Sequence, residues 1–123
     1  GVKAKANHGK VQEALRVLRV GIVYMITYPN GKIYVGQDRT DDINYFGSAD
    51  SFTIAKDFQG GWDDFTIRKQ VLARYRNITI RELNAKEREF IAALHSSNPA
   101  IGYNRTGCKR RMCRTVYLEG ETP

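Results

Sequence analysis

The most regular pattern of apolar and polar positions lies between Gly21 and Gln37. Two runs rich in β-branched and aromatic residues, GIVYMITY and KIYVGQ, flank the turn sequence Pro29-Asn30-Gly31. Proline suits the first central position of a type I turn, and glycine tolerates the left-handed conformation that follows it. The pattern predicts a β-hairpin with a three-residue loop, and a two-residue loop at Asn30-Gly31 is the alternative.

The loop length decides which residues of the two strands lie opposite each other. A three-residue loop predicts these pairs: Tyr28 with Lys32, Ile26 with Tyr34, and Tyr24 with Gly36. Because side chains alternate between the two faces of a strand, Tyr24 and Tyr34 then share one face. The opposite face is the expected core side and carries Val23, Met25, Ile33 and Val35.

Apolar spacing elsewhere predicts one more strand and three helices. They are a short amphipathic helix from Lys10 to Arg19, a helix from about Asp50 to Phe58, a strand from Phe65 to Leu72 and a helix from about Ala85 to His95. The segment 38–48 is polar and irregular. We expect a leader with the short helix over residues 1–20, a domain over 21–105 and a basic tail over 106–123.

Length and composition point to one intracellular domain. The 123 residues suffice for a single modest core, and no apolar stretch is long enough to span a membrane. The only cysteines, Cys108 and Cys113, are too few for the disulfide framework of a secreted protein. We therefore expect a protein that is not secreted, whether cytoplasmic or phage-encoded. Its start at Gly1, without Met, is typical of a processed tag or of a segment cut from a longer protein.

The charge balance favours a polyanionic partner. Twenty Lys and Arg against thirteen Asp and Glu give a net charge of +7, and each phosphate contact releases counterions. Several basic residues cluster near the C-terminus: Lys109, Arg110, Arg111 and Arg114. A basic surface that is merely solvated explains the charge equally well.

Glu87 is the most informative acidic residue. The segment Asn84-Ala-Lys-Glu87 resembles a capping box, which is a purely structural explanation for this carboxylate. Glu87 nevertheless shares a helical face with three apolar residues, Phe90, Ile91 and Leu94, whereas Glu89 points away. A carboxylate at the start of a buried stripe is costly unless something compensates it. A bound divalent cation is one such compensation.

Other candidate residues have ordinary explanations as well. Tyr24 and Tyr34 beside Gly36 leave room for a ligand, although tyrosines in strands are usually packing residues. Three cations lie on or near the predicted elements: Arg39, Lys56 and Arg68. Each of them can equally be a solvated surface charge.

Taken together, these segments resemble the GIY-YIG nuclease family. Gly21-Ile22-Val23-Tyr24 matches its GIY element with one extra residue, and Tyr34-Val35-Gly36 matches YIG. The segment LNAKEREFI resembles the motif whose helix carries a metal-binding Glu, here Glu87, and Ile101-Gly102-Tyr103-Asn104 resembles the closing GYN. The family's Arg two turns after YIG is missing. A Tyr-Phe-Gly-Ser turn follows instead, as in restriction or phage members.

The resemblance implies an α+β fold, with a small three-stranded antiparallel sheet flanked by helices, and a metal-dependent endonuclease that cuts double-stranded DNA. Glu87 would bind Mg²⁺ or Mn²⁺, while Tyr24 and Tyr34 would act on water and phosphate. Arg39 is our first choice for the phosphate-binding cation. Further DNA contacts are expected from Gly36, Lys56, Arg68, Asn104, Lys109, Arg110, Arg111 and Arg114. The role can be that of a restriction, homing or repair-type enzyme, and a restriction enzyme would be a homodimer.

Two other classes of function remain open. The same basic surface would serve a nucleic-acid-binding module without catalysis. A domain that docks a protein partner through an apolar face is the second alternative. Magnesium-dependent nicking and the salt dependence of DNA binding separate these possibilities from a nuclease.

Overall fold

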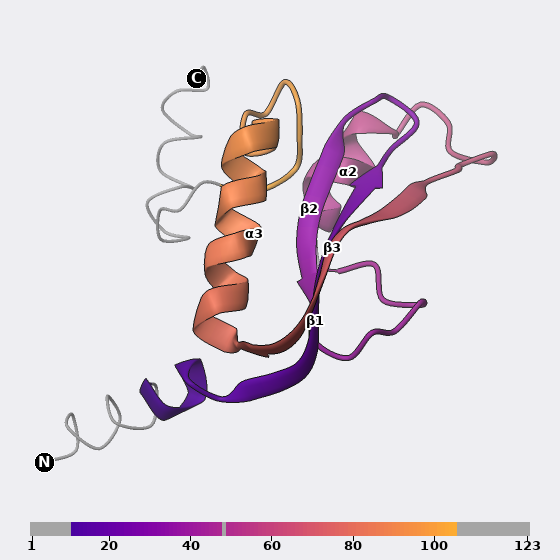
Figure 1. Cartoon of the computed structure of the whole chain (residues 1–123). Helices are drawn as coiled ribbons and strands as arrows, with labels where there is room; N and C mark the ends of the chain where they lie inside the picture. The colour runs from indigo at the N-terminus through magenta and orange to yellow at the C-terminus, as the bar shows by residue number, and fades with distance from the viewer. Residues whose placement is uncertain (1–10, 48, 106–123) are drawn as a thin grey trace, which may run out of the picture.

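The computed structural model describes residues 11–47 and 49–105 and has an α+β fold. Its elements are β1 (Val17–Thr27), β2 (Ile33–Asp38), α2 (Ser51–Asp57), β3 (Arg68–Thr79) and α3 (Ile80–Leu94). The three strands form one antiparallel sheet, as predicted, and their order is β2-β1-β3. In Figure 1, α3 runs along one side of the sheet, and the segment that follows β2 lies on the other side. Within the described residues, no helix is both long and apolar enough to cross a membrane.

The predicted hairpin is confirmed, including its register. Tyr24 lies opposite Gly36 and Ile26 opposite Tyr34, and the Tyr28 amide donates to the Lys32 carbonyl at 2.9 Å. Gly31 has a φ of +88°, the left-handed conformation expected after a type I turn. The loop therefore has three residues.

Both faces of β1 are buried, each in its own cluster. The face towards α3 contains Val23 and Val35, as predicted, together with Leu83 of the helix. The opposite face is equally closed, because Tyr24 and Ile26 are both 0% exposed. We call this second face the tyrosine face; it carries Tyr24, Tyr34 and their neighbours.

The predicted helix from Lys10 to Arg19 is wrong over most of its described length. Only one helical turn is present, at residues 11–14, and β1 already begins at Val17. Leu18 pairs with Ile78 of β3, and both side chains enter the core. The apolar positions of this segment are therefore buried by a strand distant in sequence, which helical spacing cannot reveal.

The bounds of β3 and α3 also differ from the prediction. The third strand begins at Arg68 rather than Phe65 and continues to Thr79 instead of ending at Leu72. The last helix begins at Ile80 rather than Ala85, and Thr79 is its N-cap. The cap is a reciprocal pair of hydrogen bonds between Thr79 and Glu82. The predicted capping box at Asn84 and Glu87 is therefore wrong, and α2, capped by Asp50, is confirmed.

A glycine fixes where α3 meets the sheet. A Cβ atom on Gly21 would lie 2.8 Å from a methyl group of Ile78 and 2.9 Å from one of Leu83. Both distances are too short for a real contact, so a side chain at residue 21 would force the buried side chains of Ile78 and Leu83 to shift. This packing sets the height at which the residues of α3 face β2.

Candidate functional site

Glu87 faces the edge strand β2 from α3. The Gln37 side-chain amide donates to Glu87 Oε1 at 2.8 Å and to Asn84 Oδ1 at 2.7 Å. Glu87 is half-buried, and among the described residues no Lys, Arg or His lies within ion-pair distance of it. Because the helix cap is at Thr79, helix capping does not explain this carboxylate.

Arg39 is connected to Glu87 through Gln37. The Arg39 Nε donates to Gln37 Oε1 at 3.1 Å. The single amide side chain of Gln37 therefore bridges the Glu87 carboxylate and the Arg39 guanidinium. Gln37 lies near the end of β2, an outer strand of the sheet. Sequence reasoning missed Gln37, although alternation along β2 places it on the same face as Val35 and therefore towards α3.

Gly36 and Gly47 enclose the tyrosine pair. A Cβ atom on Gly36 would lie 2.5 Å from the Tyr24 hydroxyl oxygen and 2.9 Å from the Tyr34 ring, and one on Gly47 would lie even closer to that hydroxyl. Gly47 also has a φ of +81°, which favours glycine. The Tyr24 and Tyr34 rings are 6.4 Å apart between centroids, so the predicted pairing of these tyrosines on one face is confirmed.

The Tyr24 hydroxyl is buried without a hydrogen-bond partner among the described residues. Burial raises the pKa of Tyr24 well above its ordinary value, and the neighbouring phenols of Tyr34 and Tyr45 raise it further. Tyr24 is therefore a neutral phenol at physiological pH. Tyr34 is only half-buried and is the more accessible of the two predicted tyrosines.

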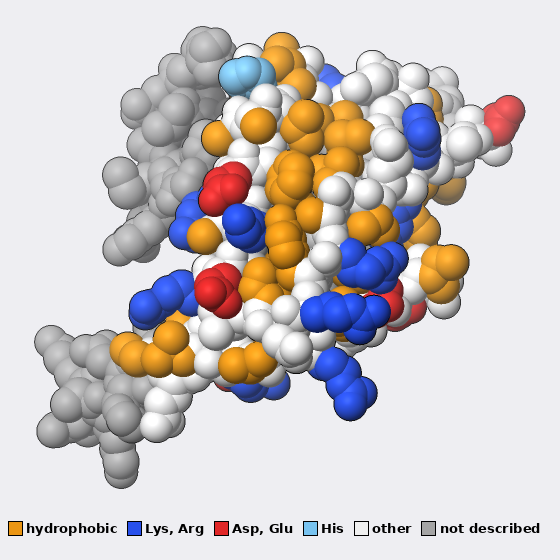
Figure 2. Space-filling view, in the orientation of Figure 1, with side chains coloured by type: hydrophobic (Ala, Val, Ile, Leu, Met, Phe, Trp, Pro, Cys, Tyr) orange, Lys and Arg blue, Asp and Glu red, His pale blue; other side chains and the backbone are white. Residues whose placement is uncertain are grey.

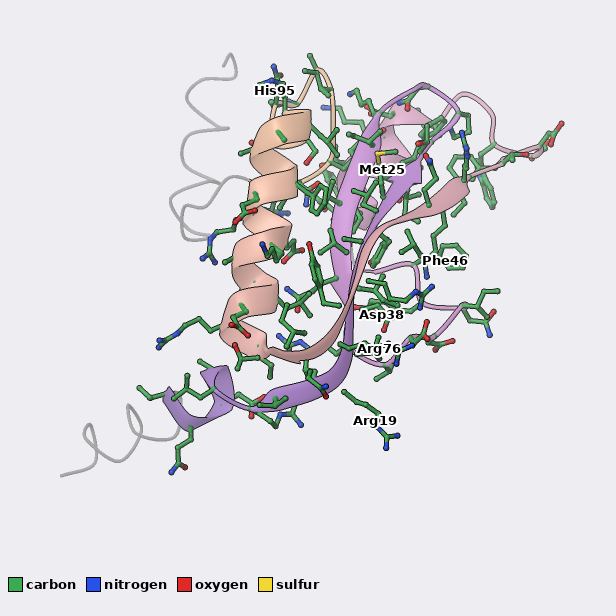
Figure 3. The ribbon with its side chains drawn as sticks, in the orientation of Figure 1. Arg19, Met25, Asp38, Phe46, Arg76 and His95 are labelled. Atoms are coloured by element: carbon green, nitrogen blue, oxygen red, sulfur yellow. The ribbon has the colours of Figure 1, made fainter. Side chains whose placement is uncertain are left out.

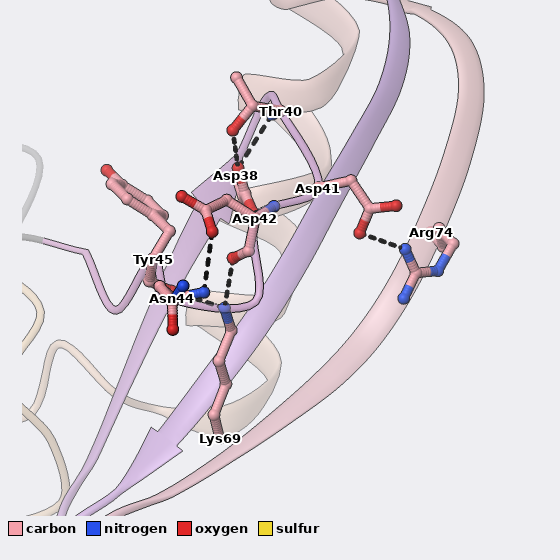
Figure 4. Close-up of polar contacts among 8 residues, drawn as sticks. All are labelled: Asp38, Thr40, Asp41, Asp42, Asn44, Tyr45, Lys69 and Arg74. Carbon is pink, nitrogen blue, oxygen red and sulfur yellow. Dashed lines mark hydrogen bonds and ion pairs between the residues drawn. The ribbon is translucent and has the colours of Figure 1, made fainter.

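Asp38 anchors the segment that follows β2, residues 39–47, which we call the site loop. The Asp38 carboxylate accepts hydrogen bonds from the Thr40 amide at 2.9 Å, the Thr40 hydroxyl at 3.0 Å and the Asp42 amide at 2.8 Å. Burial alone would raise the pKa of Asp38, but these hydrogen bonds outweigh it and hold the pKa below its ordinary value. Figure 4 shows the carboxylate at the centre of these contacts.

Two cations of β3 hold the site loop against the sheet. Lys69 Nζ donates to the backbone carbonyls of Tyr45 at 2.5 Å and Asp42 at 3.3 Å, and Arg74 pairs with Asp41 at 2.7 Å (Figure 4). Lys69 Nζ also lies 4.9 Å from the centroid of the Tyr24 ring. Sequence reasoning did not select Lys69; the signal for it is its place on β3 opposite Ile26, on the tyrosine face.

An open hollow of about 350 Å³ lies beside the site loop. It is lined by the end of β2 and the site loop: Gln37, Asp38, Arg39, Thr40 and Tyr45. Arg39 and Gln37 belong both to the hollow and to the bridge that leads to Glu87. The hollow therefore offers a cation, an amide and a nearby carboxylate to a ligand.

The remaining predicted residues lie apart from this cluster. Arg68 pairs with Thr27 and Lys56 precedes Asp57, which binds Lys32, so both lie near the hairpin turn. The bridge from Glu87 through Gln37 to Arg39 is at the other end of β2, where Asp38 pairs with Ile22. Of the predicted cations that the structure describes, Arg39 alone is joined to Glu87.

Asn104 has a structural role that the sequence did not indicate. Its side chain accepts from the Val35 amide and donates to the Val35 carbonyl, both at 2.7 Å. These bonds cover part of the outer edge of β2, next to the pairing of Ile33 with Gly102. The basic residues predicted to contact DNA near the C-terminus lie outside the described residues: Lys109, Arg110, Arg111 and Arg114.

The chain matches no known family model, and comparisons with curated proteins and with solved structures find no similar chain. Within the described residues, no group of three or more His, Cys, Asp or Glu side chains is arranged to hold a metal ion. The function of the cluster is therefore inferred from its own geometry and from the sequence motifs.

Proposed function

We propose that this protein is a metal-dependent endonuclease that hydrolyses phosphodiester bonds in DNA. The observation that carries the proposal is the bridge Glu87–Gln37–Arg39, which joins a carboxylate from α3 to a cation beside an open hollow. Tyr24 and Tyr34 lie on the tyrosine face, on the other side of the sheet from Glu87, and Tyr45, which packs on Tyr24, also lines the hollow. Hydrolysis of a phosphodiester needs a carboxylate, a cation and a group that orients water.

The environment of Glu87 is compatible with a divalent cation. The carboxylate is half-buried, and its only hydrogen-bond donor among the described residues is the neutral amide of Gln37. Magnesium commonly takes one or two carboxylates and completes its shell with water and phosphate oxygens. Glu87 would hold Mg²⁺ or Mn²⁺ on this basis. When bound, the ion would supply Lewis-acid stabilisation of charge on the phosphate.

The side chains of the protein perform the remaining tasks. Arg39 binds a non-bridging phosphate oxygen and stabilises the negative charge that develops there. Tyr34, which is half-buried beside Tyr24, orients the attacking water by accepting a hydrogen bond from it at the hydroxyl oxygen. The water oxygen bonds to phosphorus while the phosphorus–oxygen bond to the leaving sugar breaks; the attacking water releases a proton to solvent, and the leaving sugar oxygen takes up a proton from solvent. Tyr24, neutral and enclosed by Gly36 and Gly47, packs behind Tyr34 and keeps its ring in place.

Supercoiled plasmid provides the direct test. The purified protein is incubated with plasmid in Mg²⁺ and in EDTA, beside the isosteric variant Glu87→Gln and the control Glu89→Gln. Glu89 belongs to the same helix, but its side chain is 68% exposed and forms an ion pair with Lys86. We expect magnesium-dependent nicking or linearisation by the wild type and by Glu89→Gln, and a loss of at least a hundredfold in Glu87→Gln.

The outcomes separate the nuclease from its alternatives. Equal cleavage by Glu87→Gln would remove Glu87 from the site and overturn the proposed chemistry. Salt-sensitive DNA binding without any cleavage favours a non-catalytic nucleic-acid-binding module. Discrete fragments would support a restriction, phage or homing enzyme. Linearisation in a single binding event would support a homodimer that cuts both strands.

A further inference from the structure

Arginine side chains gather at the end of the sheet next to the candidate site. We call Arg19 of β1 and Arg74 and Arg76 of β3 the basic strip. Figure 3 places Arg19 and Arg76 at the same end of the sheet as Asp38, which closes β2. In Figure 2, several Lys and Arg side chains are visible over this part of the surface, and few acidic ones lie between them.

The strand register explains why these arginines are close together. Val20 pairs with Arg76 and Ile22 with Arg74, and the side chains of Val20 and Ile22 belong to the cluster of the tyrosine face. Arg74 and Arg76 therefore project on the side of the sheet that carries the site loop. Arg19 directly precedes Val20, the register partner of Arg76, and Figure 3 shows its side chain extending from the same end of the sheet as Arg76.

Their charges are only partly compensated within the described residues. Arg74 pairs with Asp41, whereas Arg19 and Arg76 have no ion-pair partner there. All three side chains belong to exposed residues. Like charges held close together at a protein surface repel one another. A bound polyanion removes that repulsion.

We infer that the basic strip binds the phosphate backbone of duplex DNA on one side of the scissile bond. The inference rests on the proposed function, because it places the strip beside the site where the backbone would be cut. Arg74 is tied to the site loop through Asp41, and Arg39 begins that loop. A backbone bound at the strip would thus continue into the hollow that Arg39 lines. The contacts contribute affinity without selecting a base sequence.

The salt dependence of DNA binding measures how many phosphates a protein neutralises. Each contact contributes about 0.9 to the slope of log K against log salt concentration. Loss of Arg19 and Arg76 should therefore reduce that slope by roughly 1.8. Over a fourfold rise in salt, wild-type binding then weakens about twelvefold more than binding by the variant.

The experiment measures binding of a fluorescent DNA duplex in EDTA, where cleavage is switched off. It compares the wild type with Arg19→Ala/Arg76→Ala and with the control Arg81→Ala/Arg88→Ala, which removes the same charge from exposed positions of α3. A third variant, Arg19→Lys/Arg76→Lys, keeps the charge and reports on folding. We expect a smaller slope only in Arg19→Ala/Arg76→Ala, with recovery in the lysine variant.

Other outcomes overturn the inference. If the control loses as much slope as the strip variant, general charge and not this surface determines binding. An unchanged slope in the strip variant also refutes the strip, whatever the plasmid assay shows. Magnesium-dependent cleavage by the wild type together with an unchanged slope would retain the nuclease and reject only the strip.

Discussion

The buried hydroxyl of Tyr24 leads to a counterintuitive prediction: its removal should stabilise the protein. Tyr24 is 0% exposed, and its hydroxyl has no hydrogen-bond partner among the described residues. The substitution Tyr24→Phe keeps the ring and its packing against Tyr34 and Tyr45. The substitution removes only the hydroxyl oxygen, which loses its hydrogen bonds to water on folding and gains none within the described residues.

The expected size follows from the cost of an unpaired buried polar group. That cost is about 1–3 kcal/mol, so Tyr24→Phe should raise the free energy of unfolding by roughly 1 kcal/mol or more. For a domain of this length, 1 kcal/mol raises the melting temperature by about 4 °C. Tyr103→Phe is the matched control, since Tyr103 is also buried but its hydroxyl donates to Asp57 and accepts from Asn30. It should lower stability by about 1–3 kcal/mol.

Stability at high pH provides a second readout. Burial raises the pKa of Tyr24 in the folded state, so the unfolded chain releases this proton first, near pH 10. Below that pH, ionisation of Tyr24 costs no stability, and above it the free energy of unfolding falls as the pH rises towards the folded-state pKa. Burial also raises the pKa of Tyr103, to about 12. Tyr24→Phe should therefore flatten the alkaline loss of stability without abolishing it.

Urea unfolding followed by circular dichroism, at pH 7 and in steps above pH 10, measures both effects. A loss of 1 kcal/mol or more in Tyr24→Phe at pH 7 would refute the reasoning, because it would mean that the hydroxyl makes a stabilising hydrogen bond. An alkaline profile identical to that of the wild type would refute the assigned direction of the pKa shift. If Tyr24→Phe raises the free energy of unfolding and Tyr103→Phe lowers it, the effect of each hydroxyl depends on whether it has a hydrogen-bond partner.

Two further substitutions test how α3 and the C-terminal segment are held. Thr79→Ala removes the N-cap of α3 and should lower the free energy of unfolding, measured in urea, by about 1 kcal/mol. The control Thr66→Ala, in an exposed loop, should leave it unchanged. Equal effects of the two substitutions would contradict the assigned cap. Asn104→Ala removes both bonds to the Val35 backbone and should cost roughly 1–3 kcal/mol. Hydrogen exchange at the Val35 amide should accelerate, and unchanged protection there would show that the bond does not form.

The hairpin was predictable because its information is local. The turn Pro29-Asn30-Gly31 fixes the loop length, and the loop length fixes the register of the two strands. Period-two alternation then places Tyr24 and Tyr34 on one face without reference to any other part of the chain. Helix α2 was predictable for the same reason, since Asp50 caps it and two glycines follow it closely.

The segments that failed are those whose structure depends on distant partners. Residues 17–20 have helical spacing, but they pair with β3, more than fifty residues later in the chain. The start of α3 was misplaced at Asn84 because that segment has the same local chemistry as the true cap at Thr79. The choice between them depends on the burial of Ile80 and Leu83 against the sheet.

The sequence by itself determined the hairpin, the shared face of the tyrosines, the α+β class and Glu87 as the acidic residue of greatest interest. Only the tertiary structure joined Arg39, the first choice among three cations, to Glu87 and brought in Gln37 and Lys69. It did so because side chains 50 residues apart meet where α3 crosses the edge of β2. Local patterns record which face a residue occupies, but contacts between α3 and β2 depend on how the helix packs on the sheet, through the cluster that contains Val23, Val35 and Leu83.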